Sequence, residues 1–136
     1  MIARSKNANV VRYDARLTSS GLERERPIDA YWLMMAEDGR RAELSWTERK
    51  LAYGFSLSSS SDTACVLRLT AFDARPIRVE RTEHGARALV AIASKRAVLQ
   101  RIFVQTTEGA LLPSVEYLDL FGKALDGSPV RERLAR

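Results

Sequence analysis

The 136-residue chain contains one cysteine and one histidine, and these two shortages exclude several kinds of site. With only Cys65 present, no intrachain disulfide can form, and its apolar surroundings at 64–67 predict a small core residue. The single histidine, His84, precedes Gly85 in a predicted hairpin turn. A turn tip is a poor position for the base of a serine triad, so the sequence offers no such triad.

Metal, nucleotide and membrane signatures are also missing. No CxxC, HExxH, EF-hand or Walker sequence occurs, so we expect no metal site and no cofactor. The apolar run at 33–36 is among the longest, far short of the roughly 18–20 residues that span a membrane. Residues 1–9 are polar and precede no apolar segment, so no secretory signal is recognised there. The chain as given is expected to be cytoplasmic, and to be exported if a signal precedes it in a longer product.

Positive charge is in excess but is not grouped along the sequence. Lys and Arg number 22 against 17 Asp and Glu, a formal net charge of +5. The signs alternate, as in Glu23–Arg26 and Arg131–Arg133, and no block of five like charges occurs. Such alternation is typical of a solvated surface rather than of a groove that follows phosphates. We therefore do not expect a nucleic acid partner, which would require aromatic side chains on an exposed basic face.

Hydrophobic residues recur mainly with a period of two, which predicts an all-β, mostly antiparallel fold. About eight short strands are expected, at 9–17, 28–35, 53–58, 64–72, 77–82, 86–93, 97–107 and 114–121. Turns are predicted at Glu37–Gly39 and Glu83–Gly85, since glycine readily takes positive φ. Short strands with frequent turns suit a barrel or a sandwich, and the sequence does not separate the two.

Helical signals are few. Ser45–Glu48 forms a capping box, which predicts one short helix near residues 46–53 that ends before Gly54. Residues from Gly122 onward are expected to form a tail, with a turn of helix at Val130–Leu134. The whole chain, 1–136, is expected to be a single domain.

Five segments in combination resemble a bacterial family catalogued as domain of unknown function 4833. They are RSKNANVVRY at 4–13, PIDAYW at 27–32, ELSWTERKLAYG at 43–54, LQRIFVQ at 99–105 and VEYLDLFG at 115–122. The resemblance spans nearly the whole chain and implies a single compact domain. It brings no known activity, cofactor or catalytic residue. Many relatives carry an export signal that this chain does not show.

Polar and aromatic residues within these segments are the candidate ligand-binding residues. Asn7 and Asn9 lie on one face of an extended segment, and each amide offers a donor and an acceptor. Tyr31 and Trp32 are neighbours on a strand, so only one of the two rings can face the interior. The alternatives are a strand entry for the two Asn and ordinary core packing for the rings.

Two later strands raise the question of a buried charge. Asp119 shares a strand face with Tyr117 and Phe121, and a carboxylate on an apolar face is costly unless it is paired. Arg101 on the preceding strand is its most attractive partner. We expect an Arg101–Asp119 pair inside a barrel, with either a structural role or a role as the polar end of a ligand pocket.

These observations favour a non-enzymatic binding module for a small amphipathic ligand or a protein partner. One alternative is a cofactor-independent acid–base enzyme, of isomerase or cyclase type, using Asp119, Glu48 and Tyr117. Another is a structural or assembly module with a filled interior and an exposed apolar edge. The oligomeric state does not follow from the sequence.

Overall fold

The computed structural model describes residues 2–4, 10–34, 38–46, 53–70, 72–107 and 114–135, and these form thirteen strands and no regular helix. In chain order the strands are β1 (Ile2–Arg4), β2 (Val10–Ala15), β3 (Leu17–Thr18), β4 (Gly21–Leu22), β5 (Ile28–Met34), β6 (Arg40–Glu43), β7 (Phe55–Ser60), β8 (Ala64–Leu69), β9 (Phe72–Thr82), β10 (Gly85–Ile92), β11 (Lys95–Thr107), β12 (Ser114–Ala124) and β13 (Pro129–Ala135). The all-β prediction is confirmed. The predicted helix falls mostly on 47–52, which lie outside the described residues.

The long strand β11 is the point at which the sheet divides. One edge of β11 pairs with β12, which pairs in turn with β13. The other edge pairs with β10 at Ala97 and Val98 and with β1 from Ile102 to Val104. From this fork one branch runs through β1, β2, β5 and β6, and the other through β10, β9, β8 and β7. All described pairings are antiparallel except that of β1 with β11.

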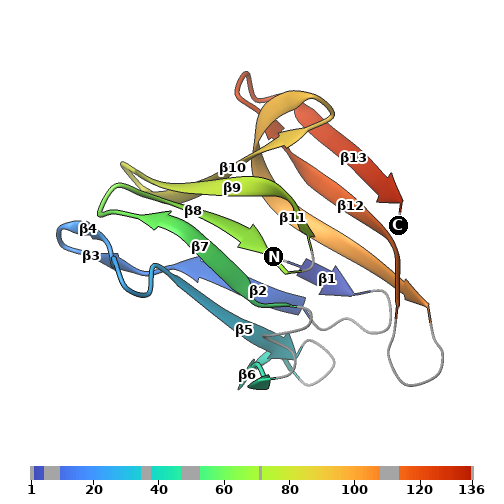
Figure 1. Ribbon diagram of the computed structural model, residues 1–136, viewed down its shortest axis with the longest axis horizontal. Coiled ribbons are helices and arrows are strands. Elements are labelled where there is room, and N and C mark those ends of the chain that lie inside the picture. The colour runs from blue at the N-terminus through green and yellow to red at the C-terminus, as the bar shows by residue number, and fades with distance from the viewer. Residues whose placement is uncertain are drawn as a thin grey trace.

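The two branches lie over one another as the layers of an open sandwich (Figure 1). We call β1, β2, β5 and β6 the first layer and β7 to β10 the second layer. No described sheet closes into a barrel, so the sandwich is the correct one of the two architectures that the sequence allowed. The core between the layers contains aliphatic and aromatic side chains from both, including Val11, Trp32, Leu67, Phe72, Ile77, Val90, Ile102 and Leu120. Cys65 is fully buried in it, as predicted.

A small hairpin, β3–β4, connects the layers away from the fork. The N–H of Leu22 donates to the carbonyl of Asp62 at 2.7 Å, which fixes the hairpin to the turn between β7 and β8. Gly21 permits this contact, because a Cβ at its position would lie 2.1 Å from the Asp62 carbonyl oxygen. The sandwich is therefore connected at two places, by β11 and by this hairpin.

The eight predicted strands all occur, and the predicted turns at Asp38–Gly39 and Glu83–His84 are confirmed. The expected tail was wrong: β12 continues through Gly122 to Ala124, and residues 129–135 form strand β13 instead of a helical turn. The reason is a period of two in Val130, Glu132 and Leu134, which are half-buried while their neighbours are exposed. Pairing of β13 with residues 117–123 of β12 stabilises this extended conformation. No described helix is long and apolar enough to cross a membrane.

Candidate functional site

A cavity lies between the two layers at the fork. Its volume is about 280 Å³, nearly twice that of the ~150 Å³ apolar cavity that holds one benzene molecule. Ala15 and Ile28 line it from the first layer, and Leu67, Leu69, Ile77, Val79 and Ala88 from the second. Ile102 of β11 also lines it. An apolar cavity of this size can hold a small organic molecule.

The fork explains why the cavity exists and where it opens. Described pairing along this edge of β11 stops at Val98 on the β10 side and resumes at Ile102 on the β1 side. A β-bulge falls in this interval, with Gln100 as the extra residue opposite β12. The bulge also turns Leu99 and Ile102 to the same inner side of the sheet. Gln100 and Arg87 stand in the lining and are exposed, so they provide the polar part of the cavity rim.

Tyr13, which is half-buried, has the one hydroxyl group among the described lining residues. Its hydroxyl donates to the carbonyl oxygen of Tyr53 at 2.6 Å, and burial raises the pKa of Tyr13 well above its ordinary value. The group is therefore neutral and already hydrogen-bonded. It gives the cavity a fixed wall and does not act as an acid or base near neutral pH.

The neighbours Tyr31 and Trp32 divide between the two faces of β5, as the strand geometry predicts. Trp32 faces the core, where its ring meets that of Tyr53 edge-on with 5.2 Å between centroids. Tyr31 faces outward, and its hydroxyl donates to Asp14 at 2.5 Å. Neither residue lines the cavity at the fork. Asn7, Asn9 and Glu48 lie outside the described residues.

Asp119 is buried, but not inside a barrel and not against Arg101. Its side chain is 3% exposed on the outer face of β12. Arg133 donates to both carboxylate oxygens, at 2.8 and 3.0 Å, and Arg131 donates at 3.1 Å. The strand register explains why Asp119 pairs with Arg133 and not with Arg101. Asp119 is directly opposite Arg133 on β13, whereas Arg101 is opposite Phe121. The expected Arg101–Asp119 pair is therefore wrong in both partner and place.

The two arginines determine the chemistry of this carboxylate. Hydrogen bonding from Arg133, and less strongly from Arg131, holds the pKa of Asp119 below its ordinary value, although burial acts in the opposite direction. Arg133 also lies over the ring of Tyr117, 4.0 Å from its centroid. A carboxylate that stays ionised and accepts from two guanidinium groups is a poor proton acceptor. This geometry gives no support to the acid–base roles considered for Asp119 and Tyr117.

A second ion pair lies on the inner side of β13. Arg75 donates to both oxygens of Glu132 at 2.8 Å, and the N–H of Ala93 donates to the same carboxylate at 2.7 Å. These bonds lower the pKa of Glu132 from 4.5 to about 2. Ala93 and Ser94 have φ values of 52° and 65°, which are uncommon for residues other than glycine. Glu132 thus holds the β10–β11 turn against β9 and β13.

The sequence reasoning missed Arg131, Arg133 and Glu132, because it assigned them to a tail. The signal was present in the sequence, because Val130 and Leu134 are an even number of residues apart, which a strand with its period of two places on one face. It also missed the β-bulge at Gln100, which leaves no mark in the pattern of hydrophobic residues. Within the described part of the chain, no cluster of three or more His, Cys, Asp or Glu could hold a metal ion.

Comparison with known proteins gives one match. A family model described as a domain of unknown function, DUF4833, matches residues 1–133. No curated protein and no solved structure matches the chain.

Proposed function

The chain belongs to the DUF4833 family, and because membership assigns no activity, we propose its function from the geometry: a binding module that holds a small apolar or amphipathic molecule at the fork. The observation that supports this proposal is the cavity of about 280 Å³ between the layers. Its wall is built from the inner faces of both layers, so a ligand would contact β2, β5, β8, β9, β10 and β11 together.

The division of polarity along the cavity favours an amphipathic ligand. The inner part is aliphatic, whereas Arg87 and Gln100 stand at the rim. Arg87 is paired with Glu80 at 2.7 Å, so the rim offers both signs of charge together with the amide of Gln100. An apolar body inside, with a hydrogen-bonding end at the rim, satisfies both parts of the site.

A neutral fluorescent probe tests the proposal without interference from surface charge. N-phenyl-1-naphthylamine has no net charge and fluoresces more strongly in apolar surroundings. We expect the wild-type protein to bind it, and Ala88→Leu to weaken binding at least tenfold by filling the cavity. Ala91→Leu is the matched control, because Ala91 is exposed on the other face of the same strand. Circular dichroism checks that both variants fold.

Absence of probe binding by the wild-type protein, or equal binding by Ala88→Leu and wild type, would contradict the proposal. Native mass spectrometry of freshly purified protein adds an independent result. An extra mass that is lost on denaturation would identify the ligand class. A bare dimer would favour the alternative of an assembly module.

A further inference from the structure

The outer face of β9 to β13 carries more cations than carboxylates. Buried Val79, Val90, Ala97, Ile102 and Leu120 point to the core, so the residues that alternate with them point outward. One row of paired outward positions runs without a break from Arg78 through Leu89, Val98 and Lys123 to Pro129. The cations on this surface, which we call the basic face, are Arg78, Arg87, Arg96, Arg101, Lys123, Arg131 and Arg133.

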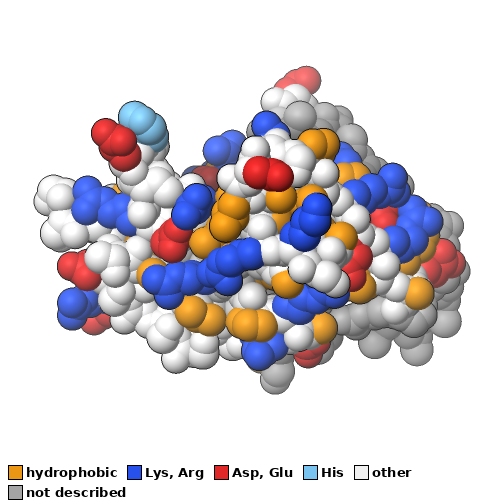
Figure 2. Space-filling view, turned by 90° about the horizontal axis from the view of Figure 1, so that it is seen from above, with side chains coloured by type: hydrophobic (Ala, Val, Ile, Leu, Met, Phe, Trp, Pro, Cys, Tyr) orange, Lys and Arg blue, Asp and Glu red, His pale blue; other side chains and the backbone are white. Residues whose placement is uncertain are grey.

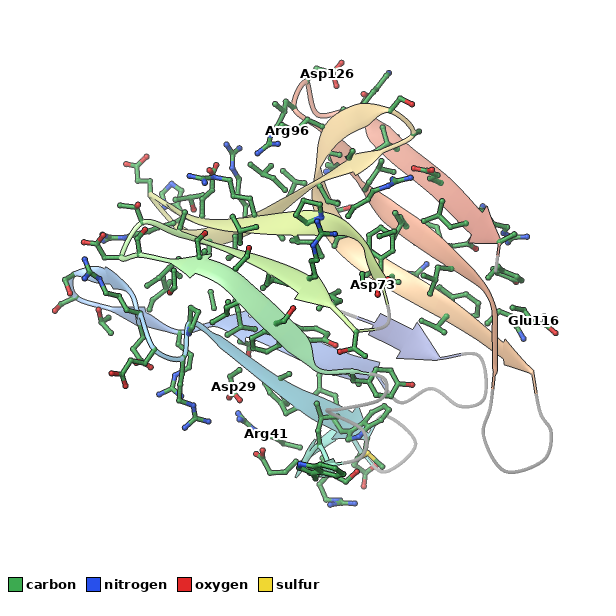
Figure 3. All side chains as sticks on the ribbon, in the orientation of Figure 1. Asp29, Arg41, Asp73, Arg96, Glu116 and Asp126 are labelled. Carbon is green, nitrogen blue, oxygen red and sulfur yellow. The ribbon has the colours of Figure 1, made fainter. Side chains whose placement is uncertain are left out.

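Within the paired registers of β9 to β13, the basic face holds two carboxylates, Glu80 and Asp119, and a third, Asp73, is exposed at the start of β9. Seven cations therefore stand against three carboxylates on this face. Figure 2 looks down on the second layer and shows Lys and Arg spread across it, with apolar side chains between them and fewer acidic ones. Glu116, the extra residue of a bulge, stands at the far end of β12 (Figure 3).

Alternation along the strands produces this concentration of charge. In Arg131–Glu132–Arg133 the two arginines point outward, while Glu132 points inward to Arg75. Positively and negatively charged residues that alternate in the sequence therefore lie on opposite sides of the sheet. The alternation that suggested a mixed, solvated surface does not describe this face.

Each of the two carboxylates within the paired registers is shared by two arginines, and the other cations remain available. Glu80 accepts from Arg78 and Arg87, as Asp119 does from Arg131 and Arg133. Arg96, Arg101 and Lys123 have no carboxylate partner within the described part of the chain. These three can take anionic groups of a partner without breaking an existing ion pair.

Three aromatic rings, those of Phe103, Tyr117 and Phe121, lie among these cations. Arg101 lies over the ring of Phe121 at 4.4 Å from its centroid, and Arg131 lies over it at 5.2 Å. The rings of Phe103 and Tyr117 are 6.5 Å apart. Flat rings and guanidinium planes at a sheet surface are the groups on which unpaired bases stack.

We infer that the basic face binds single-stranded nucleic acid, with phosphates at the arginines and bases stacked on the rings and guanidinium planes. A duplex suits the face less well, because its bases are already stacked on one another. An anionic membrane also suits it less well. The exposed large apolar residues in the described part of the chain, Leu17, Trp46, Leu57 and Leu125, all lie off its strands.

The test uses a fluorescein-labelled oligothymidine of about 15 nucleotides and fluorescence anisotropy. We expect binding that weakens steeply as salt rises from about 50 to about 200 mM, because bound phosphates release counterions. The variant Arg101→Ala/Lys123→Ala should lose about tenfold in affinity, and the slope of log K against log salt should fall by about 1.4. The double variant Arg24→Ala/Arg26→Ala is the control. It removes the same charge from exposed positions off the face and should bind as wild type does.

Base stacking is tested separately from charge. An abasic strand of equal length keeps the phosphates, and we expect it to bind at least tenfold more weakly than oligothymidine. Three results would overturn the inference: no binding at low salt, equal losses in the two double variants, or equal binding of the abasic strand. Binding of phosphatidylglycerol vesicles or polyglutamate in preference to the oligonucleotide would also overturn it. The probe experiment on the cavity is independent, because Ala88 lies on the other face of the sheet.

Discussion

The outer face of the first layer and the basic face contain the same combination of groups, with opposite results. In the first layer, the guanidinium of Arg41 on β6 lies 3.8 Å from the centroid of the Tyr31 ring on β5. On the basic face, the guanidinium of Arg133 on β13 lies 4.0 Å from the centroid of the Tyr117 ring on β12. In each place a carboxylate, Asp14 or Asp119, accepts from an arginine close to the ring.

The two faces differ in what surrounds this combination. Around Tyr31, Arg12 and Arg41 meet Asp14, Asp29 and Glu43, and Figure 3 labels the Asp29–Arg41 pair, whose atoms are 2.6 Å apart. Around Tyr117 the register supplies arginines from β11 and β13 but a single carboxylate. The same local contact therefore belongs to a charge-balanced network on the first layer and to a surface with surplus cations on the basic face.

The largest expected effect concerns Glu132. Because its carboxylate points inward, it does not offset the positive charge of Arg131 and Arg133 on the basic face. We expect Glu132→Gln to lower the free energy of unfolding by about 2–3 kcal/mol at pH 7, since its pKa is about 2 when folded and 4.5 in the ordinary state. Because the folded pKa lies below the unfolded value, this contribution is complete above about pH 4.5 and disappears as pH falls through about 2. Urea denaturation from pH 7 to pH 2 measures it. A constant difference between wild type and variant across that range would contradict the assignment.

A matched pair of substitutions compares the two carboxylates. Asp119→Ala should cost about 2 kcal/mol, because the buried group accepts three charged hydrogen bonds and its loss leaves two arginines side by side. Asp14→Ala should cost about 1 kcal/mol or less, because the Asp14 side chain is 39% exposed. Urea denaturation at low and high salt measures both losses. Equal losses would show that the two networks contribute alike.

The smallest expected effect is a difference in stability between Tyr31→Phe and Tyr117→Phe. Tyr31→Phe removes the hydrogen bond to Asp14 and should cost about 1 kcal/mol. Tyr117→Phe should leave stability unchanged, because the described contacts of Tyr117 are those of its ring with Arg133 and Phe103. Thermal denaturation followed by circular dichroism resolves the difference. A larger loss for Tyr117→Phe than for Tyr31→Phe would reverse the comparison.

Much of the fold could be predicted from the sequence, because alternation of apolar and polar residues is a local property. The eight expected strands, the buried Cys65 and the turns at Asp38–Gly39 and Glu83–His84 all follow from neighbours in the chain. The candidate site was predicted less well. Asp119 was recognised as a buried charge that needed a partner, but its partner depends on which strand lies beside β12 and in which register.

The sequence by itself determined that the chain is all-β and that it belongs to one family. Both properties follow from the order of the residues along the chain. Only the tertiary structure decided between barrel and sandwich, placed the cavity at the fork of β11 and brought seven cations to one face. The physical reason is that strand pairing joins residues far apart in the chain. A period of two states that neighbours point to opposite sides, but only the pairing decides which side faces the core and which charges meet there.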